Sequence, residues 1–96
     1  MITDKQPSSS RIQISNDAIN QASLEVRDQI QRRLEQKGFG TFASRHETLG
    51  IVTEEYHELV EAVHTGTLLN IRKELEDLAV AAIFGVACIS KESLEW

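Results

Sequence analysis

Acidic residues gather in two short segments of the 96-residue chain, at a spacing that suits the binding of a divalent cation. Glu55 and Glu58 lie three residues apart in "TEEYHELVEA", and Glu74 and Asp77 lie three residues apart in "KELEDL". On a helix the members of each pair are neighbours. Carboxylates that converge in a partly desolvated groove repel one another, and a divalent cation relieves that repulsion. Oxygen ligands alone favour Mg²⁺ or Mn²⁺, which suit phosphate-ester or anhydride chemistry.

Apolar spacing along the chain predicts the elements that carry these acids. Residues recurring every three or four positions predict helices over 16–37, 45–64 and 68–90. Gly38 ends the first helix, Ser44 and Glu47 form a capping box that opens the second, and Gly66 breaks the chain before the third. The predicted fold class is therefore all-α: a three-helix antiparallel chain that completes a four-helix-type bundle by oligomerisation.

The acids are expected beside the apolar core of this fold. At about 100° per residue, the second helix gathers one apolar stripe, which predicts its core face. The predicted core residues are Leu49, Val52, Tyr56, Leu59, Val60 and Val63. Glu55 and Glu58 flank that stripe, and Glu74 and Asp77 flank the core stripe of the third helix in the same way. A hairpin at Gly66 would bring the four acids together.

Both acidic segments resemble motifs of a known family. "EEYHE" and "ELED", separated by fifteen residues, resemble the E-E-x-x-E and E-x-x-D motifs of the MazG-like all-α nucleoside triphosphate pyrophosphohydrolases. The resemblance implies a Mg²⁺-dependent hydrolase that cleaves between the α- and β-phosphates of a nucleotide, releasing monophosphate and pyrophosphate. It implies Glu55, Glu58, Glu74 and Asp77 as metal ligands, with Glu54, Glu55 and Glu58 in catalysis and Glu54 as a possible general base.

The substrate-contacting residues are less clearly marked by the sequence. Several family members place an aromatic or amide residue one turn beyond the aspartate, where this chain has Ala81, so base recognition is expected from other residues. Candidates for base contacts are Phe39, Phe42, His46 and Tyr56. Candidates for phosphate contacts are Arg32, Arg33, Lys37, Arg45, Arg72 and Lys73. The sequence does not choose among these cations.

Composition limits the partners of the chain. A formal net charge of -5 disfavours a nucleic-acid partner. The longest uncharged apolar stretch, Leu78 to Ile89, is shorter than the ~20 residues that span a bilayer. The single Cys88 rules out a disulfide framework within the chain, which fits a reducing cytoplasm. We expect a flexible tail over 1–14 and one domain over 15–96.

Oligomer formation is expected for two reasons. The segment "LAVAAIFGVACI" is apolar on every face of the third helix, and two partner helices in one small chain cannot cover all of it. Members of the MazG-like superfamily form dimers or tetramers, with the substrate groove between subunits. A homodimer or homotetramer is therefore expected.

Other interpretations of the same residues stay open. A phosphoribosyl-ATP pyrophosphohydrolase uses similar acids, and a non-catalytic helical oligomerisation or regulatory module would retain the bundle without the reaction. The acids could also form an ordinary solvated face with Glu–Lys pairs. Glu54 and His57 supply half of a di-iron signature, but the third helix lacks the second half.

Overall fold

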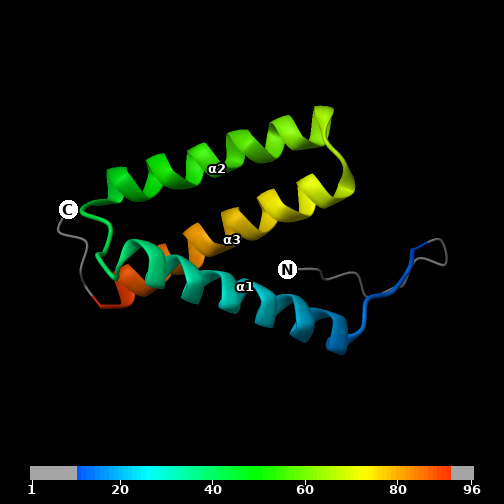
Figure 1. Ribbon diagram of the computed structural model, residues 1–96, viewed down its shortest axis with the longest axis horizontal. Helices are drawn as coiled ribbons and strands as arrows, with labels where there is room; N and C mark the ends of the chain where they lie inside the picture. The colour runs from blue at the N-terminus through cyan, green and yellow to red at the C-terminus, as the bar shows by residue number, and fades with distance from the viewer. Residues whose placement is uncertain (1–10, 92–96) are drawn as a thin grey trace.

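The structure, a computed structural model, describes residues 11–91. Over that range it contains three α-helices and no strand: α1 (Asn16–Lys37), α2 (Arg45–Thr65) and α3 (Leu68–Ser90) (Figure 1). This confirms the all-helical class and places each helix end within one residue of its predicted position. Residues 1–10 of the predicted tail and 92–96 of the predicted domain lie outside the described range, and residues 11–14 are exposed.

Side chains cap the start of each helix. The Ser15 hydroxyl accepts a hydrogen bond from the Ala18 amide, and the Ser44 hydroxyl accepts one from the Glu47 amide. Glu47 completes the predicted box differently, because its carboxylate accepts from the amide of Ala43 instead of Ser44. These contacts satisfy amides that lack partners within the helix.

Turn residues separate the helices. Gly38, with φ of 90°, ends α1 in a conformation that L side chains rarely adopt. A capping box opens α3 immediately after Gly66. The Asn70 amide donates to the Thr67 hydroxyl, and the Thr67 amide donates to Oδ1 of Asn70. The short connection between α2 and α3 therefore forces the chain to double back on itself.

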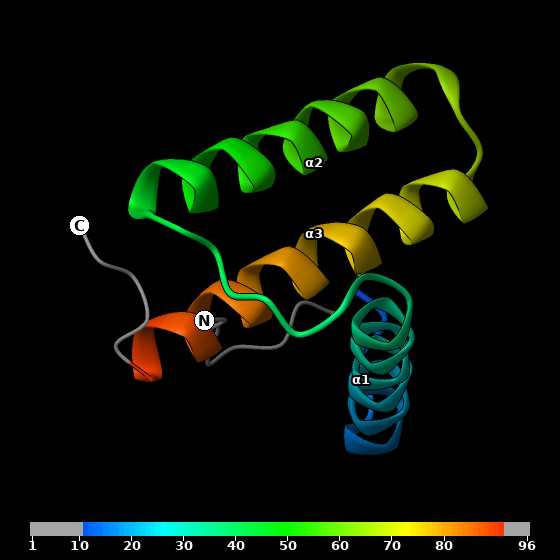
Figure 2. The same ribbon diagram turned by 60° about the vertical axis from the view of Figure 1, so that its left-hand side comes forward.

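Helices α2 and α3 form an antiparallel hairpin, and α1 crosses α3 at a steep angle (Figure 2). Gly85 of α3 lets α2 approach closely, since a Cβ atom at this position would lie 3.3 Å from Cγ2 of Thr48. Within the described residues α1 packs against α3 and not against α2. The three helices therefore form a hairpin with one crossing helix, and not the fully antiparallel arrangement that the sequence predicts.

The predicted core of α2 is only partly covered in a single chain, where Val52, Leu59 and Val60 are half-buried. Leu49, Tyr56 and Val63 are more than half exposed. The α2 residue that is buried is Ala62, which ends the stripe that begins at Ile51 and carries Glu55 and Glu58. The physical reason is that α2 has one packing partner, α3, which covers only part of its wide apolar face.

An apolar stripe along the hairpin consequently remains uncovered. Its members on both helices are Leu49, Tyr56, Val63, Leu68, Leu75, Val86 and Ile89, all at least half exposed. At 100° per residue, Leu75 and Val86 lie about half a turn around α3 from Asp77, which contacts α1. On α3, this exposed apolar stripe therefore lies on the face turned away from Asp77.

In the described part of the chain, none of the helices combines the length and the apolar character needed to cross a membrane.

Candidate metal centre

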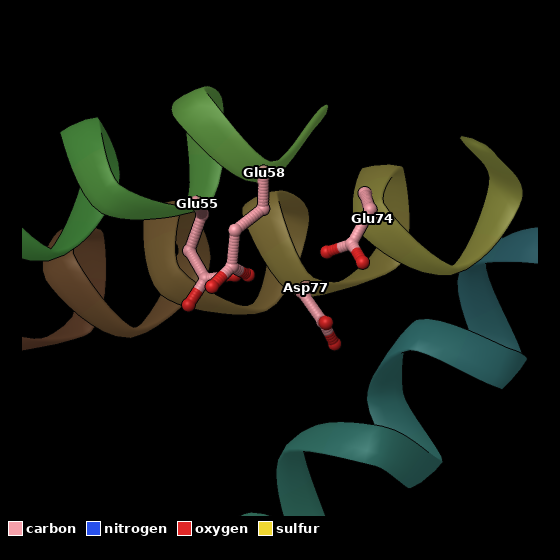
Figure 3. A group of neighbouring side chains, drawn as sticks. All are labelled: Glu55, Glu58, Glu74 and Asp77. Carbon is pink, nitrogen blue, oxygen red and sulfur yellow. The ribbon is translucent and has the colours of Figure 1, made fainter. Parts of the chain in front are cut away.

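Four carboxylates converge between α2 and α3 (Figure 3). Glu55 and Glu58 extend from α2 towards α3, where Glu74 and Asp77 lie on neighbouring turns. One oxygen from each of the four side chains lies within 4.8 Å of the others. The i, i+3 spacing on each helix and the turn at Gly66 together produce this arrangement, which we call the four-acid cluster.

The geometry of the four-acid cluster fits a hard divalent cation. Opposite oxygens around Mg²⁺ lie about 4.2 Å apart, twice the usual Mg–O distance, so small side-chain rotations would close the observed spread. Oε1 of Glu55 and Oε1 of Glu74 are buried and accept no hydrogen bond from the described residues. Buried carboxylate oxygens are costly without a donor or a cation. Two such oxygens in one cluster are therefore suited to metal ligation.

Asp77 is the most buried member of the four-acid cluster, with 5% of its side chain exposed, and two cations hold it. Arg33 donates to Oδ1 at 2.9 Å, and Lys73 donates to Oδ2 at 3.0 Å. The bond to Asp77 raises the pKa of Lys73. Because Arg33 belongs to α1, the first helix contributes directly to this centre.

Burial is the main cause that raises the pKa of Glu55 above its ordinary value. The negative charges of Glu58 and Asp77 raise it further, and so does a hydrogen bond shared with the Glu58 carboxyl group. Arg33 acts in the opposite direction. The cluster therefore holds more negative charge than its own cations neutralise.

A pocket of about 280 Å³ opens beside the four-acid cluster and shares Glu55 with it. Its walls come from all three helices and from the loop between α1 and α2. The lining residues are Ile30, Arg33, Leu34, Lys37, Gly38, Gly40, Phe42, Ile51, Glu54, Glu55, Val80, Ala81 and Phe84. Phe42 and Phe84 meet edge to face, with ring centroids 5.0 Å apart. The pocket thus combines an apolar wall with cations and carboxylates at its rim.

Several candidate substrate residues lie at this pocket or at the cluster. Lys37, Phe42, Glu54 and Ala81 line the pocket. Lys73 lies at the four-acid cluster instead, bonded to Asp77.

Other candidates lie elsewhere. Phe39 is 68% exposed, and His46 is exposed on the first turn of α2; neither lines the pocket. Tyr56 belongs to the exposed apolar stripe. Arg72 forms ion pairs with Glu25 of α1 and Glu76 of α3, and the pair with Arg72 lowers the pKa of Glu25. Contacts of these residues with a substrate stay predictions.

Sequence reasoning did not single out Arg33 from five other candidate cations. Arg33 lies one turn before Lys37 on α1, so both side chains lie on the same face of that helix. This position indicates a contact with the four-acid cluster only when the crossing of α1 over α3 is known. The same applies to Ile30, Leu34 and Phe84, whose apolar spacing indicates packing and not a pocket wall.

Comparisons of the chain with protein-family models, with curated proteins and with solved structures found no match. The resemblance to the MazG-like family therefore depends on the two motifs and their spacing.

The raised pKa of Glu55 predicts how the stability of the metal-free protein depends on pH. Between the ordinary glutamate pKa of 4.5 and the raised pKa of Glu55, the folded state binds a proton that the unfolded state has released. The free energy of unfolding should therefore fall as pH rises through this window. Glu55→Gln should remove that slope and raise the melting temperature at pH 7, measured by circular dichroism with chelator present. Glu61→Gln, on the exposed face of α2, is the charge control; a steeper slope in Glu55→Gln than in this control would contradict the prediction.

Proposed function

We propose that this protein is a divalent-cation-dependent nucleotide pyrophosphohydrolase. The observation that carries the proposal is the convergence of the four acids of "EEYHE" and "ELED" within 4.8 Å, beside a pocket with apolar and charged lining residues, with two buried oxygens that accept no hydrogen bond from the described residues. In the proposed reaction, water attacks the α- or the β-phosphorus, and the bond from that phosphorus to the oxygen that bridges the two breaks. The products are a nucleoside monophosphate and pyrophosphate.

The donor set supports Mg²⁺, with Mn²⁺ as a substitute. Glu55, Glu58, Glu74 and Asp77 would hold the ion through oxygen atoms only, which these cations prefer. When bound, the cation neutralises phosphate charge and lowers the pKa of the attacking water. The metal site in this proposal is therefore formed entirely by the α2–α3 hairpin.

The residues around the pocket support distinct roles in this reaction. Glu54 is exposed at the pocket rim, next in sequence to Glu55, where its carboxylate can accept the proton of the attacking water. Phe42 and Phe84 offer an aromatic wall for a nucleobase. Lys37 of α1 adds a cation to the pocket lining. Hydrolysis assays on a panel of nucleotides that differ in base and sugar would identify the preferred substrate. The panel should include phosphoribosyl-ATP.

We also propose that the chain works as a homodimer or homotetramer. The exposed apolar stripe runs along both helices of the hairpin, and monomeric proteins rarely leave a contiguous apolar surface of this kind in water. A second copy packing hairpin against hairpin would complete a four-helix arrangement. The same stripe also favours the second candidate function, a non-catalytic helical module, which differs in predicting no metal-dependent reaction.

The proposed function predicts that Mg²⁺ both stabilises the fold and supports pyrophosphate release from nucleoside triphosphates. A cation at one hundred times its dissociation constant should add about 2.7 kcal/mol to the free energy of unfolding. Glu55→Gln and Asp77→Asn should abolish the thermal shift and the reaction while retaining helicity, whereas Glu61→Gln should keep both. If Glu55→Gln and Asp77→Asn both kept the thermal shift and the reaction, the assignment of these residues as metal ligands would be wrong. A thermal shift without release from any nucleotide in the panel would favour the non-catalytic module.

Oligomer formation predicts a concentration-dependent mass in sedimentation equilibrium. Leu75→Glu places a charge in the middle of the exposed apolar stripe, so it should shift the protein towards the monomer because the buried charge would lack a partner. Ile83→Glu is a matched control, since Ile83 is 48% exposed on the same helix but lies towards α1. A monomeric wild-type protein across the micromolar range would contradict this proposal.

A further inference from the structure

Arg33 links the four-acid cluster to the pocket beside it. Its guanidinium donates to Oδ1 of Asp77 at 2.9 Å, and the same side chain forms part of the pocket wall. Asp77 is almost fully buried, whereas the Arg33 side chain is 34% exposed. Because Arg33 is not fully enclosed by protein, its side chain can rotate away from Asp77 towards the pocket.

A divalent cation in the four-acid cluster would compete with Arg33 for Asp77. Both carboxylate oxygens of Asp77 are already engaged, Oδ1 by Arg33 and Oδ2 by Lys73. A cation bound through Asp77 would lie within a few ångströms of both positive side chains, where like charges repel by several times the thermal energy even in a partly solvated site. Metal binding therefore weakens the two ion pairs that hold Asp77 now.

The two released cations would have different surroundings. Lys73 is 66% exposed on α3 and does not line the pocket, so its ammonium group would turn into water. Arg33 would remain at the pocket, one helical turn from Lys37, which lines the same wall. A guanidinium group matches the paired oxygens of a phosphate as well as those of a carboxylate.

We propose that Arg33 exchanges partners: it holds Asp77 in the metal-free protein and binds a phosphate-type oxyanion in the pocket once a divalent cation occupies the four-acid cluster. Metal binding then strengthens anion binding. The inference depends on the metal site of the proposed function, and it adds a coupling between the two ligands and the residue that carries it. Because coupling between two ligands is reciprocal, a bound anion tightens metal binding by the same factor.

Two titrations by calorimetry test this exchange: one with Mn²⁺ alone, and one with inorganic pyrophosphate, run both without metal and at saturating Mn²⁺. Arg33→Gln and Lys73→Gln each remove one cation from Asp77, so both should bind Mn²⁺ more tightly, by roughly three- to tenfold. Pyrophosphate affinity should fall about tenfold or more in Arg33→Gln alone, because only Arg33 lines the pocket. Arg27→Gln removes an exposed cation from the same helix that does not line this pocket, and it should match wild type in both titrations.

A further variant keeps the test decisive if Arg33→Gln does not fold. Arg33→Lys retains the charge and loses the paired donors, so it should bind Mn²⁺ as wild type does and bind pyrophosphate more weakly. Pyrophosphate binding that is equal with and without metal, or unchanged in the Arg33 variants, would overturn the exchange. Hydrolysis by a wild-type protein with those results would leave the proposed function intact. If Arg33→Gln bound Mn²⁺ more tightly and pyrophosphate more weakly but the wild-type protein hydrolysed no nucleotide, the exchange would stand and the proposed reaction would be wrong.

Discussion

Compensation of the negative charge on buried Asp77 is the constraint on which the rest of this structure depends. An unpaired carboxylate at this depth would cost several kcal/mol. Arg33 from α1 and Lys73 from α3 pair with it, while Glu55, Glu58 and Glu74 add further negative charge within a few ångströms. The packing of α1 against α3 and the proposed metal binding therefore involve the same carboxylate.

The hairpin has two different surfaces. Beside α1 it presents acids, the cations that pair with them and the pocket. Elsewhere it presents the exposed apolar stripe, which includes Leu49, Tyr56 and Val63. A domain of this size buries too little apolar surface to be very stable by itself. Ligand binding on one side and self-association on the other would both contribute to the stability of the folded state.

The sequence predicted the helices and the meeting of the four acids because both depend on local signals. Ser44 with Glu47 and the glycines at 38 and 66 mark the helix ends, and i, i+3 spacing on two antiparallel helices brings Glu55, Glu58, Glu74 and Asp77 together. These features require no knowledge of how distant helices cross.

Other features depended on tertiary contacts that periodicity does not encode. The apolar face of α2 extends around about half of its circumference, so spacing alone cannot tell the part that meets α3 from the part left exposed, and Leu49 and Tyr56 were predicted on the wrong side. The crossing of α1 over α3 decides that Arg33, and not Arg32 or Arg72, reaches Asp77. The pocket likewise depends on Phe42 and Phe84, which are distant in sequence and meet only in the fold.

Anomalous diffraction from crystals grown with Mn²⁺ tests the central claim, that the four acids form one divalent-cation site, most directly. The account predicts an anomalous peak between α2 and α3, with oxygens of Glu55, Glu58, Glu74 and Asp77 at about 2.0–2.6 Å, the range that hard cations adopt. It also predicts that the guanidinium of Arg33 has moved away from Asp77. Crystals that contain saturating Mn²⁺ but show no peak there, or a peak held only by exposed acids elsewhere, would contradict it.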